Sequence, residues 1–325
     1  GLEASTKQYV DSAVGVATAP VAKTWFVSPN AVAGNGSLNK PFAFIADALM
    51  VASANDIIHL LPGEYAEDLL LDKAITISGS NVGAFENTLI TGQVTLAIGS
   101  HGLKHLSINN PRTTATDYAV RVNGSDYAGF EDVRISRAPG GDVISYEGTG
   151  TAEHVYSNCS IRGNINMAQA VVRPVTIVGA TEKPSISMVG VQTVNVVDTR
   201  GITGINHLSG KLNLSNVTEI ASLTSAATGV SNEIVAINSS FLKADGTFGV
   251  LTMQPTTLYT FADVVYDTVA VTLGTRMAWG VASNDIKELL VPTNYTALDM
   301  SQHAHMVGID DALGAKENAG TAASV

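Results

Sequence analysis

The sequence is short of cysteine, of charged side chains and of long apolar runs, and each shortage excludes a class of protein. Cys159 is the single cysteine among 325 residues, so neither a disulfide framework nor a cysteine-based metal site is expected. Charged residues make up 14% of the chain, against a usual value of about 25%. The 18 Lys and Arg residues and 29 Asp and Glu residues give a net charge of −11, which repels nucleic-acid phosphates and anionic lipids. No apolar run reaches the roughly 18 residues that span a bilayer. Nucleic-acid binding and membrane insertion are therefore not expected.

Short apolar runs separated by Gly, Asn, Ser and Asp fill the body of the chain, residues 24–275. After Ala54 no helical pattern intervenes between them, which excludes a sheet built from alternating strands and helices. An all-β protein remains, either a sandwich or a β-solenoid. The runs are 57–61, 75–77, 94–96, 106–108, 133–135, 175–178, 194–197, 212–214, 234–237 and 269–271.

An internal repeat favours the solenoid over the sandwich. The segment 130–133 (Phe-Glu-Asp-Val) matches 103–106 (Leu-Lys-His-Leu) at an offset of 27, and 152–155 (Ala-Glu-His-Val) at an offset of 22. An apolar–charged–polar–apolar unit followed by an alternating strand and a turn residue fits one coil of a parallel β-helix. Coils of this size would stack into a rod on the order of 40–50 Å long. The spacing is irregular, so the sandwich stays open on this evidence.

The spacing of apolar residues at both ends of the chain predicts short helices that associate with other copies of the chain. In residues 1–23, Leu2, Tyr9 and Val16 are seven positions apart, and Pro20 ends the pattern. A frayed N-terminal arm is the alternative for this segment. In residues 276–325, the seam Gln302, Met306, Ile309 and Leu313 has heptad spacing. Helices this short are marginal alone, so we expect a homotrimer held together at these ends.

Four carboxylates are the strongest candidates for catalysis. Glu131 and Glu153 occupy equivalent positions in the repeat at the offset of 22, with Asp126 and Asp132 nearby. A carboxylate pair about 5 Å apart suits a retaining glycosidase. The structural alternative is a solvated surface ladder, which Lys104 in the same repeat position supports. We expect the solvated surface ladder.

His303 and His305 form the one His-x-His pair of the sequence. Side chains at i and i+2 of a helix point about 200° apart and do not share an ion. We therefore expect no metal at this pair, and no cofactor elsewhere.

The start of the body resembles the entry to the pectin-lyase-like right-handed β-helices. The residues that carry the likeness are 27–29 (Val-Ser-Pro), 34–36 (Gly-Asn-Gly), 62–67 (Pro-Gly-Glu-Tyr-Ala-Glu) and 75–79 (Ile-Thr-Ile-Ser-Gly). Between them, residues 42–54 have apolar side chains at helical spacing, as expected for the helix that caps the first coil. The resemblance implies a right-handed parallel β-helix, and specifies fold rather than activity.

The C-terminal zone resembles a recurrent segment of bacteriophage fibre proteins. Residues 292–296 (Pro-Thr-Asn-Tyr-Thr) and 305–314 (His-Met-Val-Gly-Ile-Asp-Asp-Ala-Leu-Gly) carry this likeness, with Met306 where Leu is usual. The resemblance implies a non-enzymatic structural or receptor-binding protein of a phage virion, in a tail fibre, a baseplate or a head fibre. Its partners would be other virion proteins and a host surface glycan or receptor. The alternative function is a polysaccharide-degrading tailspike, either a glycosidase or a lyase.

Overall fold

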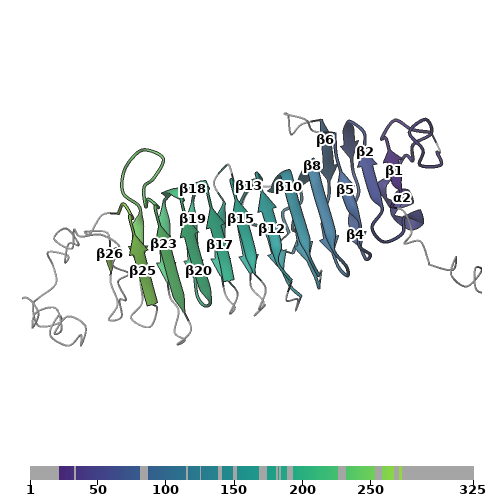
Figure 1. Cartoon of the computed structure of the whole chain (residues 1–325). Coiled ribbons are helices and arrows are strands. Elements are labelled where there is room, and N and C mark those ends of the chain that lie inside the picture. The colour runs from purple at the N-terminus through teal and green to yellow at the C-terminus, as the bar shows by residue number, and fades with distance from the viewer. Residues whose placement is uncertain are drawn as a thin grey trace, which may run out of the picture.

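Parallel strands wind the chain into an elongated rod, as Figure 1 shows. The computed structural model describes residues 22–272, except 33, 81–86, 115, 125, 138–140, 149–151, 168–173, 181, 183, 189–192, 226–231, 253–257 and 267–270. Among these residues each named strand pairs in parallel with the strand one coil earlier or later. The architecture is a parallel β-helix, because successive coils add strands to the same sheets. Its coils are right-handed, as is usual for connections between parallel strands.

The larger sheet forms one wall of the rod and contains 14 strands. Eleven of them stack in sequence order, and ten steps of about 4.8 Å give a wall about 48 Å long. They are β1 (Thr24–Val27), β2 (Ile57–Leu60), β5 (Thr76–Ser78), β8 (His101–Asn110), β10 (Ala128–Arg137), β12 (His154–Ser157), β15 (Val175–Val178), β17 (Thr193–Val197), β20 (Lys211–Ser215), β23 (Glu233–Ile237) and β25 (Leu258–Ala262). The flanking strands are β3 (Gly63–Tyr65), β6 (Thr88–Thr91) and β13 (Ser160–Arg162).

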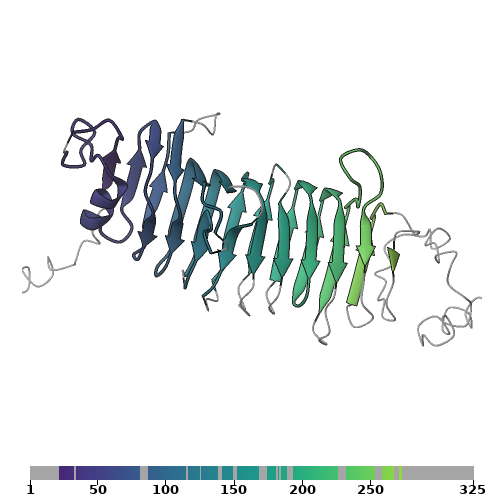
Figure 2. The ribbon, with the colours of Figure 1, turned by 180° about the vertical axis from the view of Figure 1, so that it is seen from behind.

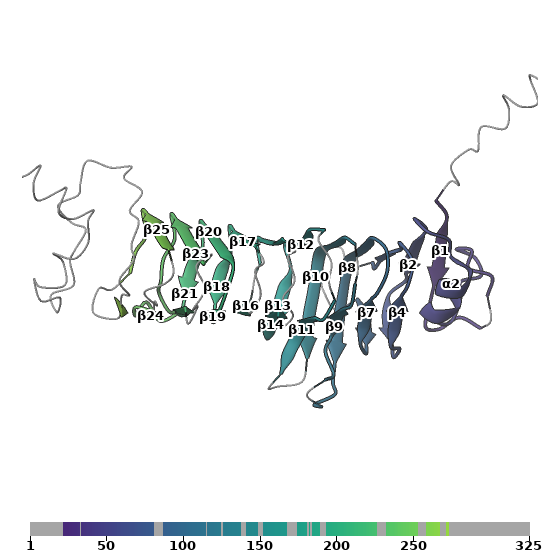
Figure 3. The ribbon, with the colours of Figure 1, turned by 90° about the horizontal axis from the view of Figure 1, so that it is seen from below.

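A second sheet of ten strands forms another wall, and Figure 3 shows the two walls as separate layers along the rod. Its strands are β4 (Leu69–Leu71), β7 (Val94–Leu96), β9 (Val120–Val122), β11 (Asp142–Tyr146), β14 (Asn164–Met167), β16 (Ser185–Met188), β19 (Gly204–His207), β22 (Ser222–Ser225), β24 (Val250–Thr252) and β26 (Val271–Thr272). A two-stranded sheet joins β18 (Arg200–Ile202) to β21 (Thr218–Ile220). The same order of strands along the rod is visible from behind in Figure 2.

The core is a set of apolar columns that run along the inside of the rod. Side chains alternate inward and outward along each strand, so paired residues on successive coils stack on one another. Phe130 pairs with Leu103 on one side and Tyr156 on the other, and the Phe130 and Tyr156 rings are 4.4 Å apart and nearly parallel. All three side chains are buried, which removes from water the apolar surface that stabilises the fold.

A second column lies at one corner of the rod, where residues with left-handed backbone turn the chain. Their φ values lie between 47° and 53°, a region that Asn and Asp adopt more readily than most residues. The strand registers place them above one another on successive coils, with Gly179 (φ 63°) taking the position after β15. The other residues of this corner column, all with left-handed backbone, are His105, Asp132, Asn158, Asp198, Asn216, Asn238 and Asp263.

The single helix of the described region, α2 (Ile45–Val51), lies at the N-terminal end of the rod (Figure 1). Ile45 and Ala48 face the core, while the carboxylate of Glu67 accepts the backbone N–H groups of Ile45 and Ala46 at 2.8 and 3.0 Å. Glu67 closes the 62–67 motif and thus caps the positive end of the helix. Within the same motif, the Tyr65 hydroxyl donates to the carbonyl oxygen of Leu61 at 2.7 Å. The 62–67 motif therefore has a structural role, which is to hold α2 and the first coil in place.

The structure confirms the fold class expected from the sequence and decides against the sandwich. It confirms the offset of 27, since Glu131 pairs with Lys104. The offset of 22 is wrong, because Ala128 pairs with His154, which is an offset of 26. The helix is shorter than the expected 42–54, since Phe44 and Ala52 have extended backbone. In the described part of the chain, no helix is both long enough and apolar enough to cross a bilayer.

The predicted terminal helices lie outside the described residues. This applies to Leu2, Tyr9 and Val16 at the N-terminus and to the seam and histidine pair at the C-terminus, namely Gln302, His303, His305, Met306, Ile309 and Leu313.

Candidate functional site

The corner between β8 and β10 brings four ionisable side chains together. Lys104 and Glu131 are paired across the two strands, with Nζ and Oε2 2.6 Å apart. At the next position of each strand, His105 and Asp132 both have φ of 52°, and His105 Nδ1 lies 3.2 Å from Asp132 Oδ2. Each of these side chains is between 36% and 47% exposed, so the group is accessible to a ligand. We call these four residues the corner cluster.

Glu131 is held in its charged form by Lys104. The hydrogen bond from Lys104 and the positive charge of that ammonium group lower the pKa of Glu131; burial opposes this, and the nearby His105 adds to it. Glu131 is therefore a carboxylate at neutral pH. It suits the role of a base, a nucleophile or a stabiliser of positive charge rather than that of an acid.

An exposed aromatic ring lies beside the corner cluster on the outer face of β10. Tyr127 is 42% exposed, and its hydroxyl oxygen lies 2.9 Å from where a Cβ on Gly129 would be. The ring thus lies over Gly129 because that residue has no side chain. Gly129 pairs with Gly102 on the previous coil, so bare backbone extends beside the ring. Glu131 is the next outward-facing residue, about 6.6 Å further along the strand.

The structure separates the carboxylates that the sequence grouped. Glu153 precedes β12 and accepts a hydrogen bond from Thr176 at 2.6 Å, whereas Glu131 pairs in register with Ser157. Glu131 and Glu153 are therefore roughly 13 Å apart along the strand direction rather than stacked. The candidate carboxylate pair about 5 Å apart is therefore wrong, because it depended on the offset of 22. Asp126 lies before β10, with its backbone N–H bonded to Gly99, whereas Asp132 belongs to the corner cluster.

Several acidic residues elsewhere on the described rod pair one-to-one with a basic residue on a neighbouring coil. Such exposed pairs contribute little to stability, but they leave the surface locally neutral. The pairs are Arg112–Asp68, Arg121–Glu147, Arg162–Glu182, Arg200–Glu219 and Lys211–Glu233. At the corner cluster, Lys104 pairs with Glu131, and Asp132 faces the imidazole of His105.

Cys159 is not a nucleophile in this structure. Burial raises the pKa of its thiol to about 12, with a further contribution from the charge of Asp132. Its sulfur donates to the carbonyl oxygen of Ser157 at 3.4 Å. The thiol is therefore a core group beneath the corner cluster.

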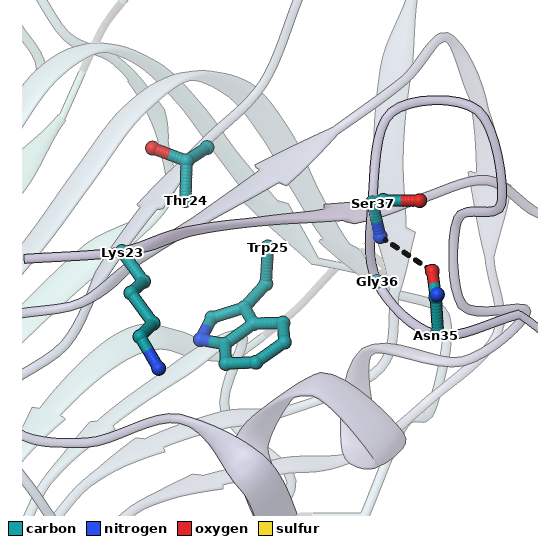
Figure 4. Close-up of a pocket in the computed structure, with 6 residues that line it drawn as sticks. All are labelled: Lys23, Thr24, Trp25, Asn35, Gly36 and Ser37. Atoms are coloured by element: carbon teal, nitrogen blue, oxygen red, sulfur yellow. Dashed lines mark hydrogen bonds between the residues drawn. The ribbon is translucent and has the colours of Figure 1, made fainter.

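A hollow of about 310 Å³ lies at the N-terminal end of the rod, between the start of β1 and the loop 35–37 (Figure 4). Its main side chain, Trp25, donates from Nε1 to Asp56 at 2.9 Å, and the Lys23 ammonium group lies 5.8 Å from the centre of the ring. Asn35 accepts the backbone N–H of Ser37 at 3.1 Å (Figure 4). These polar groups bind one another and hold the first coil together.

His105 was not identified from the sequence as a site residue. The offset of 27 places His105 opposite Asp132, so the alignment already contained the signal for the imidazole. Tyr127 is close to the carboxylates in the sequence, but the position of its ring over Gly129 depends on a side-chain rotation that the sequence does not predict.

No protein-family model matches the sequence, and no curated protein matches it either. Solved structures do match the fold. The pectate lyase Pel9A aligns with a TM-score of 0.51 at 11% identity, over 81% of this chain and 82% of that one. A rhamnogalacturonan lyase (TM-score 0.45, 12% identity, 79% and 87% coverage) and the pectin methylesterase from carrot (0.42, 14%, 82% and 91%) are further matches. At these identities the likeness is one of fold.

These comparisons contradict the expectation that the protein is not an enzyme. That expectation treated the β-helix as a purely structural body, whereas the pectate lyase Pel9A, an enzyme, has a fold of this type. The match concerns the right-handed β-helix of pectate-lyase type. Nothing in the comparisons connects the chain to a phage virion.

Proposed function

We propose that the protein binds and cleaves a polysaccharide at the corner cluster, with bacterial surface polysaccharides as the substrate class. The observation that carries the proposal is the row formed by the exposed ring of Tyr127, the bare backbone of Gly129 and the carboxylate of Glu131. An aromatic face offers an apolar surface for the C–H groups of a sugar ring, while the carboxylate beyond it can act on the adjoining glycosidic bond.

The residues of the corner cluster can take separate roles in glycoside hydrolysis. Nδ1–H of His105 donates a hydrogen bond to the carboxylate of Asp132, and Nε2 of the same ring carries the proton that passes to the departing glycosidic oxygen. Glu131, kept ionised by Lys104, stabilises the positive charge that develops on the sugar. Water then adds to the sugar carbon and gives a proton to His105, which replaces the proton that His105 gave to the glycosidic oxygen.

The β-helix makes such a surface rigid. Lys104, Glu131 and Gly129 belong to strands whose backbones pair on both sides, so the strand register fixes where their backbones lie relative to one another. Pel9A supports the proposal only in that a fold of this type is compatible with polysaccharide cleavage.

The test is an assay of the full chain against a panel of neutral and acidic bacterial capsule and lipopolysaccharide preparations. Reducing ends report any cleavage, and absorbance of an unsaturated sugar reports elimination. Hydrolysis predicts new reducing ends without the unsaturated product. The unsaturated product would instead assign a lyase, and the absence of any product across the panel would contradict the proposal.

Attachment within a phage appendage is a second candidate role. Apolar side chains are exposed near the N-terminal end of the rod, including Val32 (92%), Phe44 (58%) and Met50 (75%). Exposed apolar groups favour contact with another protein. In this proposal the chain ends assemble a homotrimer, and the rod presents the corner cluster to the glycan.

A further inference from the structure

The corner cluster presents a geometry that matches a metal ion as well as a glycan. Ligand atoms of His105, Glu131 and Asp132 all lie within 4.8 Å of one another. Two ligands about 2.0–2.1 Å from a zinc ion in a tetrahedral site are about 3.3 Å apart. The observed 3.2 Å between His105 Nδ1 and Asp132 Oδ2 matches one edge of that tetrahedron.

The charges of the corner cluster also favour the binding of a cation. The other cross-coil ion pairs named above each join one acidic to one basic side chain. Here Lys104 pairs with Glu131, while Asp132 faces the imidazole of His105. A divalent ion bound between His105 and Asp132 would offset the charge of the Asp132 carboxylate.

We propose that His105, Glu131 and Asp132 bind one divalent transition-metal ion of the zinc type, with water completing the shell. His105 and Asp132 supply the preformed edge, and Glu131 supplies the third ligand by rotation of its flexible side chain. The left-handed corner fixes the two edge residues on successive coils, so the backbone need not move.

The ligand set selects the kind of ion. An imidazole with two carboxylates suits zinc and its first-row neighbours, whereas calcium requires six to eight oxygen ligands. The corner cluster offers one nitrogen and carboxylates from two residues. Zinc is therefore expected to bind in preference to calcium.

Lys104 competes with the ion because its ammonium group holds Glu131 Oε2 at 2.6 Å. Removing this ammonium group frees the third ligand and removes a positive charge from the site. The proposal therefore predicts that a change at Lys104 tightens binding. A bound ion also takes up His105 and Glu131, so zinc should inhibit cleavage. That second effect rests on the proposed function, whereas binding does not.

The test is isothermal titration of the full chain, purified without a histidine tag, with zinc and separately with calcium. We expect one zinc per chain, at least tenfold weaker binding for His105→Asn, and severalfold tighter binding for Lys104→Met. Asn suits the left-handed corner, so His105→Asn should keep the fold, and circular dichroism checks this. Asp198→Asn, in the same corner column three coils beyond Asp132, is the matched control and should bind zinc unchanged.

Three outcomes would overturn the proposal. They are an absence of saturable zinc binding, binding that His105→Asn leaves unaltered, and calcium binding as tight as zinc binding. Polysaccharide cleavage is measured separately in metal-free buffer, so failure of the metal site and failure of the enzymatic proposal are distinguishable.

Discussion

Asp132 occupies the corner position of His105 one coil later, and the two side chains meet with Nδ1 and Oδ2 3.2 Å apart. The contact follows from the register of β8 and β10 together with the left-handed backbone that both residues share. A β-helix thus converts an offset of 27 in the sequence into a pair of adjacent functional groups.

Tyr127 is expected to contribute to substrate binding rather than to the chemical step. Tyr127→Ala removes the aromatic platform and should raise KM about tenfold while changing kcat less than threefold, since the ring does not touch the reacting bond. Steady-state kinetics on the cleaved polysaccharide measure both values. Tyr127→Phe, which keeps the ring, is the control; a KM as high as that of the alanine variant would reject the stacking role.

Glu67 is expected to stabilise the N-terminal end. Glu67→Ala leaves the N–H groups of Ile45 and Ala46 without their charged acceptor, which should lower the free energy of unfolding by about 1–3 kcal/mol. Urea unfolding measures the loss. The control is Glu64→Ala, because Glu64 is exposed and bonds the hydroxyl of Thr91, so its loss should cost less than about 0.5 kcal/mol. Equal losses in the two variants would contradict the capping role.

Stability is expected to fall in mild acid because histidines are buried in the rod. Burial lowers the pKa of His101 and His207 below 6.5, although Asp126, the Ile98 backbone and Asp72 oppose the shift at His101, and the Gly210 carbonyl opposes it at His207. The unfolded chain therefore binds protons at a pH where the folded chain does not. This contribution is complete above the unfolded pKa of about 6.5 and is lost as the pH falls below it.

The size of this effect can be measured by urea unfolding between about pH 7.5 and pH 5. Each buried histidine contributes a slope of up to about 1.4 kcal/mol per pH unit. His101→Leu should reduce the slope, because the leucine keeps the inward position apolar. A slope unchanged in this variant would show that His101 does not titrate on unfolding.

Trimeric assembly through the chain ends remains a prediction from the sequence. Sedimentation of the unmodified chain at micromolar concentration should show a trimer. Ile309→Asp or Leu313→Asp should release monomers while preserving the circular dichroism of the β-helix. A monomeric unmodified chain would reject this assembly.

The sequence predicts the fold where apolar and polar residues alternate along a strand and turn residues follow it. Short apolar runs located most of the stacked strands of the larger sheet but few strands of the second sheet. The 103–106 match to 130–133 gave the correct register for β8 and β10. The false match at 152–155 shows the limit of such alignment: Ala152 and Glu153 lie before β12, so similar residue types occupied a different part of the coil.

The site was less predictable, for a physical reason. Glu131 and Asp132 were recognised as candidates, but their partners depend on which side chain of the next coil reaches them. Tyr127 lies over Gly129 through a side-chain rotation that no spacing encodes. Glu67 was read as part of a family motif, whereas its role as the acceptor for α2 required the structure.

The most direct measurement of the central claim compares the unmodified chain with Glu131→Gln on the same bacterial polysaccharide. The substitution keeps the size of the side chain and removes the charge that Lys104 holds in place. The account predicts that the unmodified chain releases reducing ends and that Glu131→Gln lowers the rate at least 100-fold with unchanged circular dichroism. Cleavage at an undiminished rate by the variant would contradict it.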